Sequence, residues 1–356
     1  MPTPPVVLPY SSFNKPAAQL GPAPSELQPL AERLLTYGGG DAPEGEISLE
    51  LLDYSVPIYQ INIDAANKIT TTYGFNGYWA RFYPLAFSQA LGAAGNIAPG
   101  TRVPYSSNFI KAPGNDGVFI LENRRDGRVF YFWMAHGAVI NAITATNILA
   151  GLFSNSMKHI AGAASVSKPF TATKHVSQRG MGIEKRALVI TGEELLTGEI
   201  RHAAELTVTN TWYCLGSVKN AVKGVDWLPP ATRCEFNSTS YPGAERDRTK
   251  LVPEGLRIAF QVTPEEREVW LTSKGFTGAF KNFARIIINC WCDYGLVVAE
   301  TGGHGMGVQT TGMYGPDRSI YESFGIQMNT AAMQEQALKT FANDFRDRAW
   351  VVRPAA

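Results

Sequence analysis

The sequence carries almost no net charge, since 32 lysines and arginines are balanced by 31 aspartates and glutamates, for a formal charge of +1. Proteins that bind nucleic acid usually present a strongly basic surface, so this balance argues against a nucleic-acid partner. Apolar residues nowhere form a run of the roughly 18 that a helix needs to cross a bilayer. We therefore expect neither a nucleic-acid partner nor a membrane span.

A secretory signal peptide is also missing. The first residues, MPTPPVVLPYSSF, contain neither a basic start nor an apolar central region. We therefore expect a protein that stays in the cytoplasm or leaves the cell by another route, as a component of a phage virion does. Of these, a virion-associated or extracellular location is favoured.

Cysteine and histidine are scarce, with four and five residues. Cys290 and Cys292 are separated by one residue in a segment with helical periodicity, which points their side chains to different sides of the helix. We expect free, partly buried thiols, with a disulfide between Cys214 and Cys234 as the alternative. The sequence has no CxxC pair and no two histidines at ligand spacing, so it predicts neither a metal site nor a cofactor.

Glycine and proline, in contrast, are abundant, with 34 and 22 residues. Turn-dense β architectures carry such a composition. The sequence predicts a mainly β fold, an antiparallel β-sandwich or jelly-roll-like body with two or three packed helices. We expect a proline- and glycine-rich N-terminal arm over 1–45, a β-rich main domain over 46–328, and a C-terminal helix and tail over 329–356. The alternative is two smaller β-rich domains that divide near residue 215.

The clearest hairpin consists of GVFILEN and RVFYFWMAHG, joined by a turn at 124–127 that has glycine where a positive φ is needed. Both faces of the second strand are apolar, which predicts a central strand. Trp133 lies within this strand and His136 ends it. Aromatic faces can stack on sugar rings, so Trp133, His136 and Tyr83 from the aromatic segment YGFNGYWARFYPLAF are candidate substrate-binding residues. Burial in a core is the alternative explanation for these aromatics.

The segment GMGIEKRALVITGEELLTGEIRHAA, residues 180–204, concentrates glycine, acidic and basic residues around one histidine. Thr191 is a good helix N-cap, and Gly198 ends that helix. The strand that follows, 200–210, places His202 on its apolar face. His202 is therefore either a hydrogen-bonded buried histidine or a base that lines a cleft and is tuned by a neighbouring carboxylate.

Further polar candidates occur at the ends of predicted strands. Arg257 begins the strand LRIAFQV, where it could clamp a carboxylate or phosphate, or form an internal ion pair. The strand LVVAE ends at Glu300 and enters the loop TGGHGMG, which presents His304. This loop lacks the GxxxxGK[ST] pattern of a phosphate-binding loop.

Helices are expected in the last third of the chain. The residues TPEE at 263–266 form a strong helix start, with threonine as N-cap and proline in the first turn. A second helix is expected over 278–294, with Gly295 just beyond its end. A last amphipathic helix is expected over 330–348.

The segments SSFNKP, PGNDGVFILENRRDGRVFYFW, TGEELLTGEIRHA, PEGLRIAF and YGLVVAETGG follow one another over most of residues 10–303. Together they resemble a group of poorly characterised bacterial secreted proteins with similar forms in phages. The resemblance marks His202, Arg257 and Glu300 as recurring polar positions, although the group more often has aspartate in place of Glu300. The missing signal peptide departs from the secreted members and favours the phage-like side. The resemblance implies a shared fold rather than a reaction.

The first hypothesis is a protein of a phage tail or the cell exterior that binds or cleaves a polysaccharide, as a lyase or a hydrolase. His202 would act as acid or base, and Arg257 would clamp a substrate carboxylate. Tyr294 or Glu300 would be the second proton-transfer group. A hydrolase needs two carboxylates, for which Glu184 and Glu300 are the expected pair.

The second hypothesis is a structural virion or assembly protein without chemistry. Its proline-rich arm and C-terminal helix would dock on neighbouring subunits or on copies of itself. The two hypotheses differ in geometry. Under the first, His202, Arg257 and Glu300 converge on a cleft with exposed aromatics, whereas under the second they are scattered or internally paired.

Overall fold

Contacts along the chain divide it into two units. One consists of Met1–Leu51, Phe170–Met313 and Asp317–Ala356, and the other of Leu52–Pro169 with Tyr314–Pro316. The computed structural model describes residues 12–40, 45–84, 97–98, 100–114, 116–137, 159–167, 180–209, 211–212, 214, 222–235, 248–302 and 305–354.

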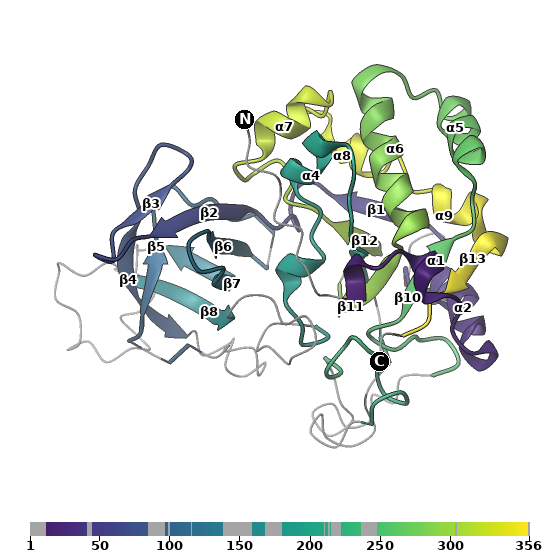
Figure 1. Cartoon of the computed structure of the whole chain (residues 1–356), viewed down its shortest axis with the longest axis horizontal. Helices are drawn as coiled ribbons and strands as arrows, with labels where there is room; N and C mark the ends of the chain where they lie inside the picture. The colour runs from purple at the N-terminus through teal and green to yellow at the C-terminus, as the bar shows by residue number, and fades with distance from the viewer. Residues whose placement is uncertain are drawn as a thin grey trace. The chain divides into compact units, whose positions relative to one another are not determined.

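The first unit is built on a six-stranded sheet with the order β1-β12-β9-β11-β10-β13 (Figure 1). β1 pairs with β12 and β9 with β11 in parallel, and the other neighbours are antiparallel. The residues of β9, β10 and β12 are all buried, as expected for strands covered on both faces. The strands span Ile47–Glu50 (β1), Ala204–Val208 (β9), Arg257–Phe260 (β10), Leu296–Thr301 (β11), Met306–Gln309 (β12) and Ala349–Val351 (β13).

Helices surround this sheet, and α6 contributes most to its core. Its apolar residues recur at helical spacing, so Phe283, Ile287 and Trp291 are all fully buried. Burial of each such side chain stabilises the fold by about 2 kcal/mol. Within the described part of the chain, each helix is too short or too polar to cross a bilayer. The helices span Ala17–Leu20 (α1), Pro29–Tyr37 (α2), Gly192–Thr197 (α4), Pro264–Ser273 (α5), Gly278–Asp293 (α6), Arg318–Ser323 (α7), Ala331–Glu335 (α8) and Phe341–Asp344 (α9).

The predicted helix signals are confirmed where they rest on local chemistry. Thr191 caps α4 and Thr263 caps α5, and each forms a capping box with a glutamate three residues later. Gly198 ends α4 in the left-handed conformation, with φ 78°. Gly295 follows α6 with φ 91°, and a side chain there would collide with the carbonyl of Ile258.

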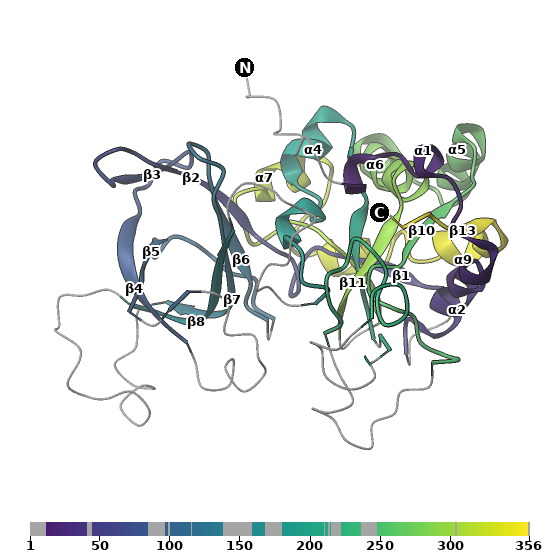
Figure 2. The same ribbon diagram turned by 60° about the horizontal axis from the view of Figure 1, so that its bottom comes forward.

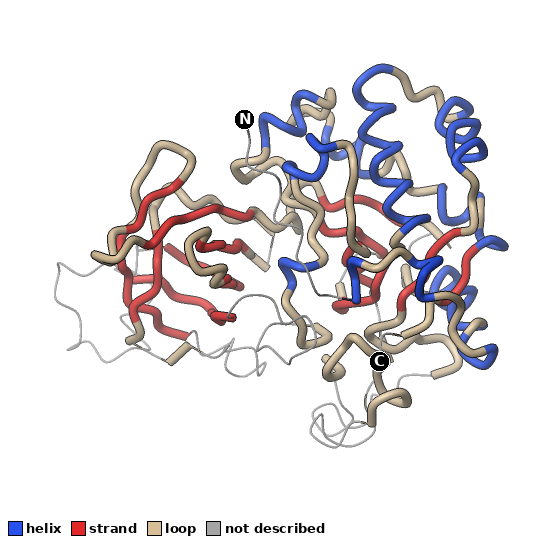
Figure 3. Tube along the Cα trace, in the orientation of Figure 1, coloured by secondary structure: helices blue, strands red, loops and turns tan. Residues whose placement is uncertain are grey.

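The second unit contains a seven-stranded sheet with the order β3-β2-β6-β7-β8-β4-β5. β2 pairs with β6 and β4 with β8 in parallel, and the remaining pairs are antiparallel. The described residues of this unit form only strands and loops, as Figure 3 shows. The strands span Ile58–Ile63 (β2), Ile69–Thr71 (β3), Tyr78–Pro84 (β4), Arg102–Tyr105 (β5), Phe119–Asn123 (β6), Val129–Gly137 (β7) and His159–Ser167 (β8).

This second sheet curls around a single apolar core (Figure 2). Ile69 from β3 and Val103 from β5 belong to the same buried cluster, although their strands lie at opposite ends of the sheet. The rings of Phe119 and Phe132 stack with centroids 4.7 Å apart across the β6–β7 hairpin. The predicted hairpin and its turn are therefore confirmed, with Gly127 at φ 69°.

The expectation of a mainly β fold with a few packed helices is confirmed. The C-terminal segment differs from the helix predicted over 330–348, because it contains three short pieces instead: α8, α9 and a 3-10 turn at Arg346–Arg348. The Lys339 carbonyl accepts a hydrogen bond from the Ile47 amide, 3.1 Å away, which removes it from a helical hydrogen-bond ladder.

The cysteine prediction was half right. Cys290 and Cys292 are buried free thiols, as expected. Cys214 and Cys234, however, form a disulfide with Cα atoms 6.1 Å apart.

Two long-range hydrogen bonds connect the segments near this disulfide. The Trp212 indole donates to the Asp226 carbonyl, and the Leu228 amide donates to the Glu254 carbonyl. Sequence spacing alone could not show these contacts.

Candidate functional site

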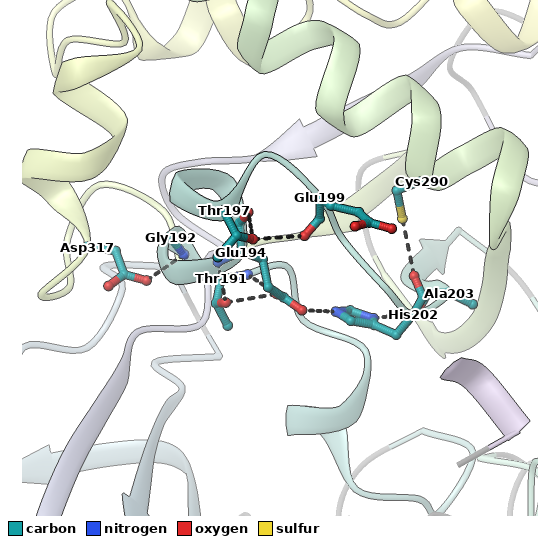
Figure 4. Close-up of polar contacts among 9 residues, drawn as sticks. All are labelled: Thr191, Gly192, Glu194, Thr197, Glu199, His202, Ala203, Cys290 and Asp317. Atoms are coloured by element: carbon teal, nitrogen blue, oxygen red, sulfur yellow. Dashed lines mark hydrogen bonds and ion pairs between the residues drawn. The ribbon is translucent and has the colours of Figure 1, made fainter. Parts of the chain in front are cut away.

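His202 lies where the chain passes from α4 to β9 (Figure 4). The Oε2 of Glu194 accepts hydrogen bonds from the amide and hydroxyl of Thr191, at 2.9 and 2.8 Å. The other carboxylate oxygen, Oε1, lies 3.0 Å from the Nε2 of His202. One carboxylate thus completes the helix cap and pairs with the histidine.

Both ring nitrogens of His202 face acceptors, since Nδ1 lies 2.8 Å from the Ala203 carbonyl and Nε2 faces Glu194. A carbonyl and a carboxylate cannot donate, so the arrangement favours a hydrogen on each nitrogen. Burial alone would lower the pKa of His202. The charge and hydrogen bond of Glu194 have a larger, opposite effect, so the pKa of His202 is raised above its ordinary value. Burial raises the pKa of Glu194, but the charge of His202 prevails and lowers it to about 2. The structure therefore favours an ion pair, in which the imidazolium is not a base.

Arg257 is buried, and its guanidinium is directed at backbone carbonyls. Nε donates to the Tyr294 carbonyl at 2.7 Å, and Nη2 donates to the Lys15 carbonyl at 2.8 Å. Burial lowers the pKa of Arg257 to about 10, so the side chain remains cationic at neutral pH. Arg257 therefore ties the segment before α1 to the end of α6.

Glu300 belongs to a buried ion-pair cluster around Lys185. The Lys185 Nζ lies 2.7 Å from Glu300 and 2.5 Å from Glu205. Glu184 directly precedes Lys185 and is 1% exposed. Glu300 is therefore held in a buried salt bridge, and Glu184 is buried next to Lys185 in sequence.

Glu254 is a buried carboxyl that sequence patterns do not single out. Its Oε2 accepts the Glu235 amide at 2.8 Å, whereas its Oε1 has no hydrogen-bond partner. Burial, and then the charge of Glu235, raises the pKa of Glu254 well above its ordinary value. The structure therefore favours the protonated form of Glu254 more than solvent would.

The three predicted positions do not share one cleft. In the β9–β11 pairing, Ala204 lies opposite Leu296, whereas Glu300 lies opposite Thr207. At about 3.3 Å per strand residue, Glu300 is roughly 15 Å further along the sheet than His202. His202, Arg257 and Glu300 are 5%, 4% and 6% exposed. Each is internally bonded and shielded from solvent.

The predicted substrate-binding residues lie in the second unit or outside the described residues. Trp133 is 3% exposed, and its indole donates to Asp116 at 2.9 Å, so it presents no open face. The backbones of Tyr83 and His136 lie in β4 and β7, but their side chains are outside the described part of the structure. His304 is also outside the described residues.

One groove opens beside Tyr294, the remaining predicted catalytic residue. It has a volume of about 770 Å³ and is bordered by the start of α1, the end of α6 and strand β13. Tyr294 and Trp350 are partly exposed, and Glu199 and Asp293 are exposed. The lining residues are Pro16, Ala18, Gly21, Pro22, Glu199, Phe260, Gln261, Val262, Thr263, Arg267, Cys292, Asp293, Tyr294 and Trp350.

Two carboxylates of the groove are held by arginines. Asp293 lies 2.7 Å from Arg267, and Glu199 lies 2.7 Å from Arg201. Burial raises the pKa of Tyr294, as does the charge of Glu199. The groove therefore combines aromatic surface with fixed hydrogen-bonding groups of both charges.

Sequence patterns do not single out Trp350, Arg267 or Asp293. These residues come from separate elements, and only long-range contacts bring them together. One local indication of this groove was available in the sequence, because Asp293 and Tyr294 lie at the end of a predicted amphipathic helix.

Comparisons with protein-family models, curated proteins and solved structures found no match to this chain. The resemblance to secreted and phage-associated proteins therefore stays a prediction.

Proposed function

We propose that this chain binds polysaccharide through the groove beside Tyr294. A sugar ring has an apolar face and a rim of hydroxyl groups. The partly exposed rings of Tyr294 and Trp350 supply surface for the apolar face. Arg267, Asp293 and Glu199 supply donors and acceptors for the hydroxyls. This combination in one open groove carries the proposal.

Arg257 acts in this proposal by positioning the groove walls. Its two hydrogen bonds join Lys15, next to Pro16 on one wall, to Tyr294 on the other. Because the guanidinium is buried beneath these backbones, it does not clamp a substrate carboxylate itself. The sequence-based role of Arg257 is replaced by a structural one.

His202 acts in a similar way. Its pairing with Glu194 joins α4 to the start of β9, and Glu199 lies in the short segment between these partners. The Cys290 thiol donates to the His202 carbonyl at 3.3 Å, which fixes the same segment against α6. The ion pair therefore supports binding rather than acid–base cleavage.

The disulfide supports a location outside the reducing cytoplasm. Disulfides persist mainly in oxidising environments, such as the cell exterior and virion surfaces. The Cys214–Cys234 bond therefore fits a glycan-binding protein of a phage tail or the cell exterior.

The test is affinity electrophoresis and calorimetry with a panel of neutral and acidic polysaccharides. We expect Trp350→Ala and Tyr294→Ala to weaken binding by about tenfold each, as expected from the loss of a stacking aromatic. Tyr37→Ala is the matched control, because Tyr37 is 41% exposed on α2 and does not line the groove. Unchanged affinity in both groove variants, or no binding by the parent chain, would overturn the proposal. If incubation with a polysaccharide produced new reducing ends, the chain would cleave the polymer as well as bind it.

An architectural role is the second candidate, and one observation favours it. His202, Arg257 and Glu300 are all paired internally, as the assembly hypothesis expects. Light scattering that shows a large defined assembly, combined with no polysaccharide binding, would favour this role over the first.

A further inference from the structure

A second groove lies at the β2–β3 hairpin of the seven-stranded sheet. It is open and has a volume of about 650 Å³. Most of its lining residues are of polar type, among them three consecutive threonines and two consecutive arginines. The lining residues are Ile61, Asn62, Asp64, Thr70, Thr71, Thr72, Arg124 and Arg125.

The strand register builds this groove. Asn62 lies opposite Thr70 in the β2–β3 pair, so the amide and hydroxyl side chains are neighbours. On the other side of β2, the Arg124 amide donates to the Ile61 carbonyl at 2.9 Å. This bond holds the β6–β7 turn beside the hairpin, so the two arginines border the same groove as the threonines.

The turn itself is fixed by a single side chain. The side-chain NH2 of Asn123 donates to the Asp126 carboxylate at 2.7 Å. The side-chain oxygen of Asn123 accepts a hydrogen bond from the backbone amide of Ile63 at 3.1 Å. The backbone that carries Arg124 and Arg125 is therefore held in place before any ligand arrives.

The charges in the turn leave a cationic edge. Asp126 pairs with Arg128 at 2.7 Å, so the acid of the turn is already neutralised. Arg125 is exposed, donates to the Ile63 carbonyl at 3.3 Å, and forms no ion pair among the residues that the structure describes. Asp64 is the one acid among the lining residues, and Arg125 brings an exposed positive charge to the same groove.

We propose that this groove binds the anionic groups of an acidic polysaccharide, an inference that rests on the proposed glycan-binding function. Guanidinium groups match the planar oxygens of a carboxylate and the oxygens of a sulfate. The threonine hydroxyls, Asn62 and Asp64 match the hydroxyl groups on the rest of each sugar unit. The expected ligand is therefore a polysaccharide that carries uronate or sulfate groups.

The composition of the groove favours a saccharide over a nucleic acid. Binding of single-stranded nucleic acid relies on aromatic side chains that stack on bases and on a longer basic track. The lining has no aromatic side chain and only two arginines. Without a stacking aromatic or a longer basic track, these lining residues suit a saccharide better than a nucleic acid.

The test measures dissociation constants of the full chain for oligogalacturonate, dextran sulfate and neutral dextran, with inorganic sulfate and phosphate as small-anion probes. The variants are Arg124→Gln/Arg125→Gln and Arg125→Gln alone, because loss of the exposed Arg125 should not disturb folding. Arg353→Gln is the matched control, since it removes one exposed positive charge from the first unit, outside this sheet.

We expect the double variant to weaken binding of at least one acidic polymer by about tenfold or more, as for the loss of charge-assisted hydrogen bonds. The double variant should bind neutral dextran as the parent does, and Arg353→Gln should bind the acidic polymers as the parent does. Equal affinity of parent and double variant for both acidic polymers, or phosphate binding as tight as polymer binding, would overturn the inference. If the double variant binds both acidic polymers as the parent does while Trp350→Ala weakens dextran binding, the proposed function stands and this inference fails. If the parent binds no polymer, both fail.

Discussion

Glu194 and His202 form a buried ion pair, in which a helix-capping carboxylate also holds the ring of a histidine eight positions along the chain at 3.0 Å. The same carboxylate accepts two hydrogen bonds from Thr191. Local capping and tertiary pairing therefore depend on one side chain, and its loss would affect both.

Stability should be greatest in a pH window set by this pair. The raised pKa of His202 stabilises the fold fully below its unfolded value of 6.5, and this contribution is lost as the pH rises through the folded value. Glu194, with a pKa of about 2, stabilises the fold above its unfolded value of 4.5, and this contribution is lost as the pH falls toward 2. Thermal melts should therefore show the largest contribution of the pair between pH 4.5 and 6.5.

The variant Glu194→Gln should flatten this maximum. It should also lower the free energy of unfolding by about 3–5 kcal/mol, because it leaves a buried histidine without its counter-charge. Glu193→Gln is the control, since it removes one charge from the same turn and leaves the His202 pair intact. A Glu194→Gln profile that follows the parent across the pH range would contradict this assignment.

Glu254→Gln should make the stability of the protein less dependent on pH above 4.5. The folded state keeps a proton on Glu254 that the unfolded state releases above its ordinary value of 4.5, so stability falls as the pH rises through the raised pKa. Glutamine is neutral at every pH, so the variant does not lose stability in this way. Denaturant melts should therefore show that the free energy of unfolding of the variant rises relative to that of the parent as the pH increases.

Glu300→Gln provides the comparison for Glu254→Gln. It should lower the free energy of unfolding by about 3–5 kcal/mol, because the buried Lys185 then loses one of its two carboxylate partners. If both variants are equally destabilised at neutral pH, the raised pKa assigned to Glu254 is wrong.

Removal of the Cys214–Cys234 disulfide should lower stability by about 3 kcal/mol, as expected for a closed loop with a sequence separation of 20 residues. Denaturant melts of the parent with and without reductant would measure this difference. A Cys214→Ser/Cys234→Ser variant should match the reduced parent and respond no further to reductant. A parent that is insensitive to full reduction would argue against the structural importance of this bond.

Arg257→Lys should destabilise the protein, although the charge is kept. One ammonium cannot reproduce both guanidinium hydrogen bonds, and each bond from a charged group contributes about 1.5–3 kcal/mol. Arg353→Lys is the control, because its exposed guanidinium also contacts a backbone carbonyl of the N-terminal segment, at Pro22. We expect a clear loss of stability for Arg257→Lys and a negligible one for the control.

Features that depend on neighbouring residues could be predicted from the sequence. Thr191 and Thr263 cap their helices because the glutamate that completes each box is three residues away. The β6–β7 hairpin follows from its turn and its apolar alternation. The strand predicted over 200–210 is β9, but it begins at Ala204, so His202 is buried in the segment just before it.

The partners of the polar residues could not be predicted in the same way. Lys185 reaches Glu300 across 115 residues of sequence, and Arg257 reaches Lys15 across 242. A strand pattern predicts which face a residue occupies but contains no information about which distant segment covers that face. The groove beside Tyr294 depends on such coverage, so only Tyr294 among its lining residues was a candidate.

The division of the chain has a consequence for its synthesis. Ser48 in β1 donates to the Met306 carbonyl in β12, 258 residues later, and the seven strands of the second sheet lie between them in sequence. On the ribosome, those seven strands emerge and can pair while β1 still lacks its partner. The six-stranded sheet can therefore form only near the end of translation. Until then, the edges of β1 have no strand of this sheet to pair with.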